Sequence, residues 1–413
     1  MTVPSITRDE RNPGLERAQW KRRALQRGRR RAVRRGAPPK RAETGRHNPF
    51  SWDLRQATIE SDDEKSQCDV SHRLASGCKR IKLLHPKTRA DEIPPIAGEC
   101  WFLAGPTAAG KTAVGLDLAR RLGAEIVSMD SMAVYRGMDI GTAKPTPRQR
   151  AVVAHHLIDV VDPWDEFSLA DYVRAAHERA ARIVARGRPA LFVGGTPLYL
   201  KALLRGMFEG PPADAPLRRC LLRLARAHGS TRLHAELARV DPDAAARLHP
   251  NDTKRLIRAL EVYATTGRPI SRWQRQFDRP RADAPRHVFV LDWPRPLLAE
   301  RIDRRVDAMF ASGLVDEVAR LWLAQRPLGR TARQAVGYRE VIEHIEGRLA
   351  LGDAIEQVKR HTRQMAKRQM TWFRSLAECR MIPCNEPFDA RSVAERIAAE
   401  GTSVPAGGDA PRS

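Results

Sequence analysis

The stretch from Cys100 to Leu122 constrains the fold of this chain more than any other. It begins with a short apolar run, Trp101 to Ala104, which predicts a buried strand, and it ends with an amphipathic run, Ala113 to Leu122, which predicts a helix. Between them stands GPTAAGKT, residues 105–112, and the spacing G-x-x-x-x-G-K-T after a strand and before a helix is that of a phosphate-binding P-loop. The sequence therefore predicts binding of a phosphorylated molecule, without indicating which one.

Each residue type in this loop suits a phosphate. Backbone N–H groups and the N-terminus of the following helix point at phosphate oxygens, and Gly105 and Gly110 allow a close approach that a side chain would block. Lys111 places a positive charge on the terminal phosphates, and the hydroxyl of Thr112 is positioned to hold Mg²⁺. The phosphate-binding residues predicted by the pattern are Gly105, Pro106, Thr107, Ala108, Ala109, Gly110, Lys111 and Thr112.

Apolar segments alternate with helical ones after the loop. A helix capped by Ser168 is predicted to run to Gly187. The fold class predicted by the alternation is α/β, a P-loop-type doubly wound parallel sheet. Ligands bind such sheets at the carboxyl ends of the strands, where Asp130-Ser131 and Gly194-Gly195-Thr196 also fall. Beyond Trp101 to Ala104, the predicted strands are 125–129, 157–161, 189–193 and 287–292.

The domain organisation follows from changes in composition. The strands stop over 206–285, where arginine-rich helices are predicted over 217–228, 231–239, 242–248 and 252–266. We therefore expect a basic, disordered arm (1–95), the first part of the α/β core (96–205), a helical insertion (206–285), a return to the core (286–385), and a tail (386–413) that is disordered from about 401. Helices in the returning part are predicted over 296–311, 314–324, 332–345 and 354–376.

The charge of the chain is strongly basic. The 413 residues include 73 Lys+Arg against 49 Asp+Glu, a formal net charge of +24. Such an excess predicts a polyanionic partner, first of all nucleic acid and second an anionic membrane surface, although a compositional bias toward arginine would give the same net charge. The basic run from Arg17 to Arg46 could be an RNA-tethering arm or a solvated tail, or it could result from a wrongly chosen upstream start codon. An arginine-rich targeting presequence is disfavoured by the acidic residues nearby.

Cysteine usage and hydropathy bear on the compartment. The six cysteines show no spacing typical of a zinc site, so free thiols in a reducing compartment are expected. No apolar run approaches the roughly 18 to 20 residues that span a bilayer. The N-terminus lacks the apolar core of a signal peptide, so we expect a cytoplasmic protein that does not associate with a membrane.

Two side chains outside the loop are candidates for chemistry. Asp130, at the end of a strand next to the P-loop, could hold a metal ion, accept a proton from a nucleophile or only cap the next turn. Thr196 follows two glycines and offers a hydroxyl where the backbone can approach a ligand, although Gly-Gly-Thr also suits a plain strand-to-helix turn.

Longer blocks of the sequence carry a resemblance to a known family. They are GPTAAGKT (105–112), DSMAVYRGMDIGTAKPT (130–146), HHLIDVVDP (155–163), FSLADY (167–172), VGGTPLYLKALLRG (193–206), HPNDTKRLIRALEVY (249–263) and QAVGYRE (334–340). In order and spacing these blocks resemble those of the tRNA dimethylallyltransferases. The resemblance spans roughly residues 100–380 and does not reach the basic arm. The sequence shows no C-terminal zinc finger of the kind seen in eukaryotic relatives, which suits a bacterial-type enzyme.

The resemblance implies a reaction and roles for particular residues. A dimethylallyl group would pass from its diphosphate to N6 of the adenosine beside the anticodon, with diphosphate in the P-loop, Mg²⁺ on Thr112 and no ATP consumed. Asp130 matches the family's general base, Arg305 would stabilise the leaving group, and Thr196 matches a residue at the reacting centre. Contacts to the tRNA anticodon stem-loop are implied for Asp130, Ser131, Met132, Ala133, Thr196, Arg218, Lys254, Arg255, Leu256, Ile257, Arg258, Gln334, Ala335, Val336, Gly337 and Tyr338. The protein is expected to act as a monomer.

Three other functions stay open at this point. The P-loop alone also fits a small-molecule kinase, although no lid motif is evident. The same prenyl chemistry could act on free adenylate, and the basic surface could belong to an RNA-binding protein with a degenerate nucleotide site. Intact Lys111, Thr112 and Asp130 weigh against the last alternative.

Overall fold

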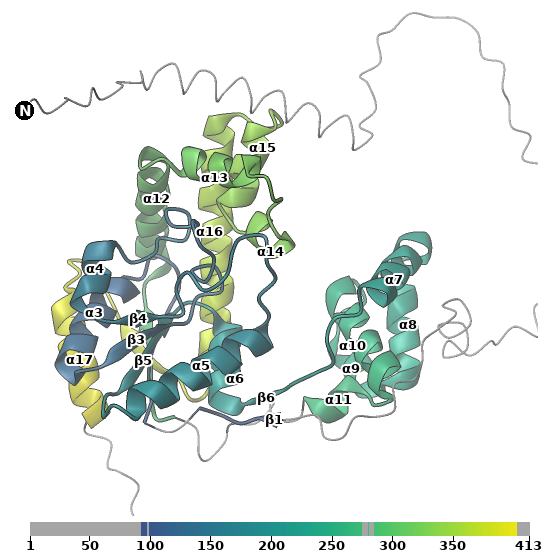
Figure 1. Cartoon of the computed structure of the whole chain (residues 1–413), viewed down its shortest axis with the longest axis horizontal. Coiled ribbons are helices and arrows are strands. Elements are labelled where there is room, and N and C mark those ends of the chain that lie inside the picture. The colour runs from purple at the N-terminus through teal and green to yellow at the C-terminus, as the bar shows by residue number, and fades with distance from the viewer. Residues whose placement is uncertain (1–91, 97–98, 275–279, 281–284, 403–413) are drawn as a thin grey trace, which may run out of the picture. The chain divides into compact units, whose positions relative to one another are not determined.

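The computed structural model describes residues 92–96, 99–274, 280 and 285–402 (Figure 1). These residues belong to two compact units, one formed by Ile93–Gly206 with Pro280–Ser413 and the other containing Met207–Arg279. The predicted arm up to residue 91 and the tail from 403 onward lie outside the described residues, as do Cys68 and Cys78. No helix in the described part of the chain is long and apolar enough to cross a membrane.

The first unit is built on a six-stranded sheet in the order β4-β3-β5-β2-β7-β8. All its strand pairs are parallel, which confirms the predicted fold class. Its strands are β2 (Trp101–Ala104), β3 (Glu125–Ser128), β4 (His155–His156), β5 (Ala190–Gly194), β7 (His287–Asp292) and β8 (Arg380–Pro383). The apolar runs of β2, β3 and β5 fit central strands that are covered on both faces.

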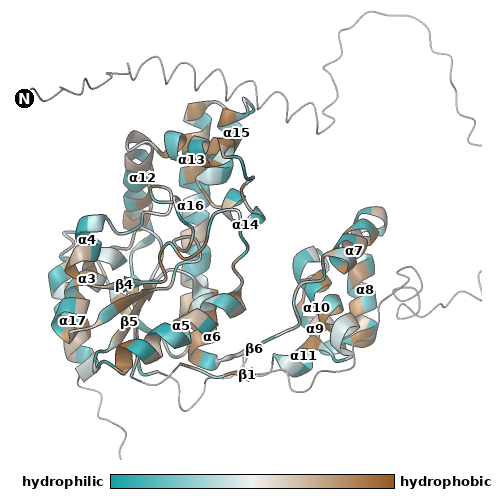
Figure 2. Cartoon of the chain, in the orientation of Figure 1, coloured by the Kyte–Doolittle hydropathy of each residue, from teal (hydrophilic) through white to brown (hydrophobic). Residues whose placement is uncertain are grey.

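Helices cover both faces of this sheet (Figure 1). On one face lie α3 (Lys111–Leu122), α12 (Arg295–Ala311) and α17 (Ala390–Thr402), and on the other lie α5 (Leu169–Val184) and α6 (Pro197–Arg205). Side chains alternate along a strand, so Leu103 packs on the α3 face while Phe102 turns away and stacks on Phe192 with ring centroids 4.9 Å apart. Figure 2 shows hydrophobic residues concentrated in strands such as β5 and mixed with hydrophilic ones along the surrounding helices.

A second apolar cluster of this unit forms around the loop that follows β3. Val134, Tyr135 and Met138 from that loop pack with α13 (Leu314–Leu323), α14 (Arg330–Arg333) and α15 (Tyr338–Ile345). The long α16 (Leu351–Arg374) packs against α12 and α15, and the short α4 (Pro147–Val152) follows the loop in the chain. Packing of these helices fixes the loop that carries Asp130.

The second unit is helical. Its helices are α7 (Ala215–His228), α8 (Ser230–Val240), α9 (Pro242–Arg247), α10 (Thr253–Thr266) and α11 (Ile270–Trp273). They enclose an apolar core that includes Leu221, Leu237 and Leu260. Two short strands, β1 (Glu92–Ile93) and β6 (Met207–Phe208), form a separate two-stranded sheet where the chain passes between the units.

Two predicted elements are wrong in detail. The strand predicted over 157–161 is only β4, two residues earlier, because Leu157 and Asp159 take positive φ angles of 59° and 56° that end the extended run. The helix predicted over 332–345 is broken between α14 and α15, since Gly337 has a φ of 93°, outside the helical region.

The predicted ends of the folded part also need correction. Residues 386–413, predicted as a tail, contain α17, whose buried Ala394 and Ile397 join the apolar core beside α3. The arm predicted to reach residue 95 overlaps β1, and the buried Ile96 donates a backbone hydrogen bond to the carbonyl of Leu203 at 2.9 Å. Strand β8 and helix α4 had no predicted counterpart.

Candidate active site

Three loops meet at the carboxyl edge of the neighbouring strands β2, β5 and β3. The P-loop follows β2, Gly195-Thr196 follows β5, and Met129-Asp130 follows β3. Together with α12, α16 and the loop 335–338, they line a cavity of about 440 Å³. The polar stretches that the sequence placed at this edge therefore do share one site.

The P-loop forms an open cradle of backbone amides. Gly110 has a φ of 89°, and α3 begins directly after it. Among the described residues, the N–H groups of Gly110, Lys111 and Thr112 donate to no protein acceptor, as is usual for the first turn of a helix. Unpaired amides at a helix N-terminus attract anions, so the cradle fits a phosphate group.

The two glycines at the end of β5, Gly194 and Gly195, let the loops approach closely. A Cβ atom on Gly194 would lie 2.0 Å from the carbonyl oxygen of Met129, which no neighbour could accommodate. At Gly195 a Cβ atom would lie 2.9 Å from Nε2 of Gln369 and 3.5 Å from Nζ of Lys111. Glycine is thus required here by close packing, which a plain strand-to-helix turn would not explain.

Gln369 of α16 joins two of the loops. Its Oε1 accepts a hydrogen bond from the backbone N–H of Thr107 at 3.0 Å, and its Nε2 donates to the carbonyl of Gly195 at 2.5 Å. Sequence reasoning missed this residue, because Gln369 and Thr107 are 262 positions apart and one glutamine on a basic helix carries no local signal.

The two oxygens of Asp130 have different environments. Oδ1 accepts hydrogen bonds from the backbone N–H groups of Met132 at 2.8 Å and Ala133 at 3.4 Å, which caps the turn. Oδ2 accepts none from the residues that the structure describes. Thr196 lies beside it, and its Oγ1 accepts a hydrogen bond from the N–H of Ser131 at 3.1 Å. One carboxylate oxygen is therefore left for a ligand in the cavity.

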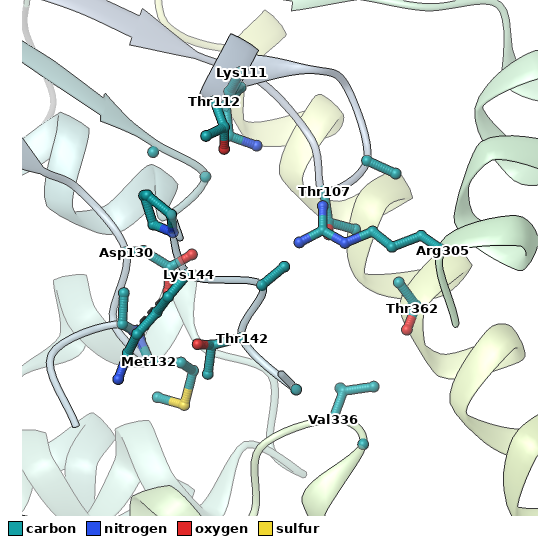
Figure 3. Close-up of a pocket in the computed structure, with 18 of the residues that line it drawn as sticks. Thr107, Lys111, Thr112, Asp130, Met132, Thr142, Lys144, Arg305, Val336 and Thr362 are labelled. Carbon is teal, nitrogen blue, oxygen red and sulfur yellow. Dashed lines mark hydrogen bonds between the residues drawn. The ribbon is translucent and has the colours of Figure 1, made fainter. Parts of the chain in front are cut away.

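Two basic side chains face this carboxylate. Arg305 reaches from α12 into the cavity that Asp130 and Lys111 also line (Figure 3). Burial and, to a smaller extent, the charge of Arg305 lower the pKa of Lys111 to about 7, although Asp130 opposes the change. Burial likewise lowers the pKa of Arg305, and Asp130 partly offsets this effect. Nζ of Lys111 donates to the carbonyl of Pro106 at 2.7 Å, and an anion bound nearby would favour the charged form of the amine.

The predicted RNA contacts of the first unit fall into three classes. Thr196 and residues 130–133 and 335–337 line the cavity, whereas Gln334 is exposed but outside its lining. Tyr338 also borders the cavity, but its side chain is fully buried and its hydroxyl donates to Glu317 at 2.6 Å. The ring of Tyr338 is part of the apolar core, so its side chain has a structural role, and an RNA contact at this residue stays a prediction.

The predicted contacts of the second unit are also divided. Lys254 and Arg255 are exposed on α10. Leu256 and Ile257 are buried in the core of the unit, so their side chains serve packing, and the predicted contact of this turn of α10 with RNA stays a prediction.

Arg218 and Arg258 share one buried partner in this unit. Both donate to the carboxylate of Glu261, which is fully buried, at 2.6 to 2.9 Å. Burial alone would raise the pKa of Glu261, but the hydrogen bonds from Arg218 and Arg258 outweigh it and lower the pKa. The two arginines therefore have a structural role.

The residues of the cavity suit a Mg²⁺ ion only if a phosphate group binds the ion as well. Among the residues that the structure describes, no group of three or more His, Cys, Asp or Glu side chains is placed to hold a metal ion. The hydroxyl of Thr112 lines the cavity beside the unpaired amides. Since Mg²⁺ keeps several waters and binds through one or two protein oxygens plus substrate phosphates, this donor set fits a phosphate-bound ion.

Comparisons with known proteins agree with the geometry. Residues 133–376 match the family model described as IPP transferase, and residues 98–155 match one described as isopentenyl transferase. A tRNA dimethylallyltransferase of Rhodopirellula baltica is 49% identical over 75% of this chain and 95% of its own length. One from Syntrophobacter fumaroxidans is 45% identical over 76% of this chain and 89% of its own length.

Solved structures give the same result. The tRNA isopentenylpyrophosphate transferase of Bacillus halodurans is 38% identical, with a TM-score of 0.54 over 74% of this chain and 97% of that one. A eukaryotic dimethylallyltransferase acting on tRNA is 26% identical, with a TM-score of 0.60 over 72% of this chain and 77% of that one. On the family match, the identities and the cavity together, this chain belongs to the IPP transferase family.

Proposed function

We propose that this chain transfers a dimethylallyl group from dimethylallyl diphosphate to N6 of the adenosine next to the anticodon, position 37 of the tRNA, and releases diphosphate. The observation that carries the proposal is that a phosphate cradle and a carboxylate with one unengaged oxygen line the same cavity. The 49% identity to the tRNA dimethylallyltransferase of Rhodopirellula baltica supports it.

The donor side of the cavity suits a diphosphate leaving group. As the bond from the allylic carbon to oxygen breaks, its electron pair moves onto diphosphate. Lys111, Arg305 and the amides of Gly110 to Thr112 are the groups that stabilise this charge. A diphosphate also raises the pKa of Lys111 and returns it to the charged form, since an anion favours the protonated amine.

The acceptor side needs a base. The exocyclic amine of adenine is a poor nucleophile because its lone pair is delocalised into the ring, so its proton must leave as the new C–N bond forms. Oδ2 of Asp130 takes that proton, while Oδ1 holds the carboxylate in place through the amides of Met132 and Ala133. Oγ1 of Thr196 accepts a hydrogen bond from the backbone N–H of Ser131, the neighbour of Asp130. Thr196 therefore helps to orient the carboxylate of Asp130.

Thr112 would hold Mg²⁺ together with the two phosphates. The ion, when bound, supplies further positive charge for the departing diphosphate. The protein groups already named perform binding, orientation and proton transfer.

The RNA must deliver an unstacked base. Anticodon-loop bases are splayed, so the target adenosine can flip into the cavity at a small cost. Residues 130–133 and 335–337 border the base, and the exposed Lys254 and Arg255 contact the phosphate backbone. We propose that the reaction takes place in the cytoplasm and that the protein acts as a monomer.

A label-transfer assay tests the function. The protein is incubated with labelled dimethylallyl diphosphate and either tRNA, AMP or ATP, and each acceptor is analysed for label. Label on tRNA alone, with ATP intact, is the expected result. Label on AMP would support an adenylate prenyltransferase, and cleavage of ATP would support a kinase, and either outcome would refute the proposal.

A further inference from the structure

The P-loop contains a strained residue that is not glycine. Ala108 has a φ of 63°, in the left-handed region that residues with a Cβ atom rarely adopt. Such a conformation is strained and persists only where the surrounding structure holds it. The neighbours of Ala108 should therefore include groups that fix its backbone.

Arg301 and Trp293 bind the loop from outside the cradle. Nε of Arg301 donates to the carbonyl of Ala108 at 3.0 Å, and Nε1 of Trp293 donates to the carbonyl of Ala109 at 3.1 Å. The guanidinium of Arg301 also lies over the Trp293 ring, 4.2 Å from its centroid. Two successive carbonyls are thus held away from the cavity, which leaves the following amides free to face it.

The C-terminal segment completes this arrangement. Oε1 of Glu386 accepts a hydrogen bond from Nη1 of Arg301 at 2.6 Å. The ring of Phe388 lies 5.0 Å from the Arg301 guanidinium, and a Cβ atom on Gly110 would come within 2.6 Å of that ring. Glu386 and Phe388 are anchored by α17, which packs along α3 through Ile397.

We propose that Trp293, Arg301, Glu386 and Phe388 form a buttress that sets the conformation of the phosphate cradle from behind. These are positioning residues of the donor site, and the segment 386–402 is part of the donor-site machinery. The proposal rests on the proposed function, in that the cradle binds diphosphate.

Substitutions in the buttress should weaken diphosphate binding specifically. Arg301→Lys keeps the positive charge but loses the planar fork that reaches Ala108 and Glu386 together. Phe388→Ala removes the ring against Gly110. In each variant we expect the affinity for inorganic diphosphate, measured by calorimetry, to fall by about tenfold, which corresponds to about 1.4 kcal/mol. KM for dimethylallyl diphosphate rises in parallel, while the Kd for tRNA changes by less than about twofold.

The matched controls are Ile183→Ala and the milder Ile183→Val. Ile183 is fully buried in α5, which covers the face of the sheet opposite to α3, α12 and α17, so these variants lower the thermal stability and leave the buttress intact. Diphosphate affinity close to that of the parent protein is expected for both.

Two outcomes would overturn the buttress. Either unchanged diphosphate affinity in Arg301→Lys and Phe388→Ala, or an equal loss in the Ile183 variant of matched thermal stability, would show that these contacts serve only folding. Failure of the parent protein itself to bind diphosphate would instead refute the proposed donor site. The two failures are therefore distinguishable.

Discussion

At the scale of single residues, Asp130 caps the turn after β3 and is also the general base of the proposed reaction, two roles that the sequence left as alternatives. Its Oδ1 caps the turn after β3, as the bonds to Met132 and Ala133 show, and Oδ2 remains available for proton transfer. An isolated sequence could not separate these roles, because both need a carboxylate at the end of that strand.

Replacing Asp130 should separate the cap from the base. Asp130→Asn keeps an oxygen that can accept from both amides but cannot take a proton, so we expect kcat to fall by about 10² to 10⁴-fold with tRNA affinity retained. Asp130→Ala removes the cap as well, so it should show a similar loss of kcat and a lower melting temperature. Turnover near that of the parent protein in Asp130→Asn would contradict the assignment of the base.

Lys111 should take up a proton when diphosphate binds. Its pKa is lowered from 10.5 to about 7 by burial, so at pH 8 most of the free protein carries the neutral amine. A bound diphosphate restores the charge, and calorimetry in buffers of different ionisation enthalpy should therefore detect uptake of about one proton at pH 8 and less at pH 6. Lys111→Arg, which stays charged, is the control, and equal uptake by both proteins would argue against the assignment.

The same pKa has a consequence for folding. Between about pH 7 and pH 10.5 the unfolded chain holds a proton that the folded chain has released, so stability rises with pH in this window. Below pH 7 the buried charge opposes folding in the unliganded protein.

At the scale of elements, the sequence pattern predicted those helices and strands whose stabilising interactions lie within the element itself. The strands β2 and β7 and the helix α5, with its cap Ser168, were predictable because hydrophobic period and capping chemistry lie within the element. The break before α15 was missed because a single Gly337 interrupts an otherwise helical pattern.

Elements fixed by distant partners were beyond that reasoning. Helix α17 was predicted as a tail because its apolar face is short, and it is ordered by α3, nearly 300 positions earlier in the chain. The role of Arg301 and Phe388 behind the P-loop depends on the same long-range packing. The site was therefore predictable in its loops and not in what supports them.

The link between α7 and α10 gives a prediction at this scale. In the Arg218→Ala/Arg258→Ala double variant the buried Glu261 loses both side-chain partners. This loss should destabilise the helical unit by about 3 kcal/mol. The destabilisation is not larger because both arginines are partly exposed to solvent. Hydrogen exchange in α7 and α10 should speed up. Adding Glu261→Gln should restore part of the protection, and unaltered exchange in the double variant would exclude the structural role.

This link should also depend on pH. The pKa of Glu261 is lowered in the folded state, so its stabilising contribution is present above the ordinary value of 4.5 and is lost as the pH falls through the lower folded value. The double variant should therefore lose less stability on acidification than the parent protein.

At the scale of the whole molecule, the net charge of +24 and the basic arm bear on RNA affinity. Because Ile96 and β1 belong to the fold, the informative truncation removes residues 1–91 and leaves Glu92 in place. We expect this protein to fold and to keep its kcat, with tRNA affinity equal or weaker. A shallower dependence of tRNA affinity on salt would identify an RNA-tethering arm, and an unchanged slope a solvated tail. An inactive truncation would contradict the expectation.

The central claim is that one cavity brings the diphosphate of a prenyl donor and an RNA adenine together. The most direct test is mass spectrometry of nucleosides from tRNA that has been treated with the protein, dimethylallyl diphosphate and Mg²⁺. We expect the parent protein to form N6-dimethylallyladenosine at the position next to the anticodon, and we expect this nucleoside to be nearly absent with Asp130→Asn. Unmodified tRNA, or a prenyl group on another atom or nucleotide, would contradict it.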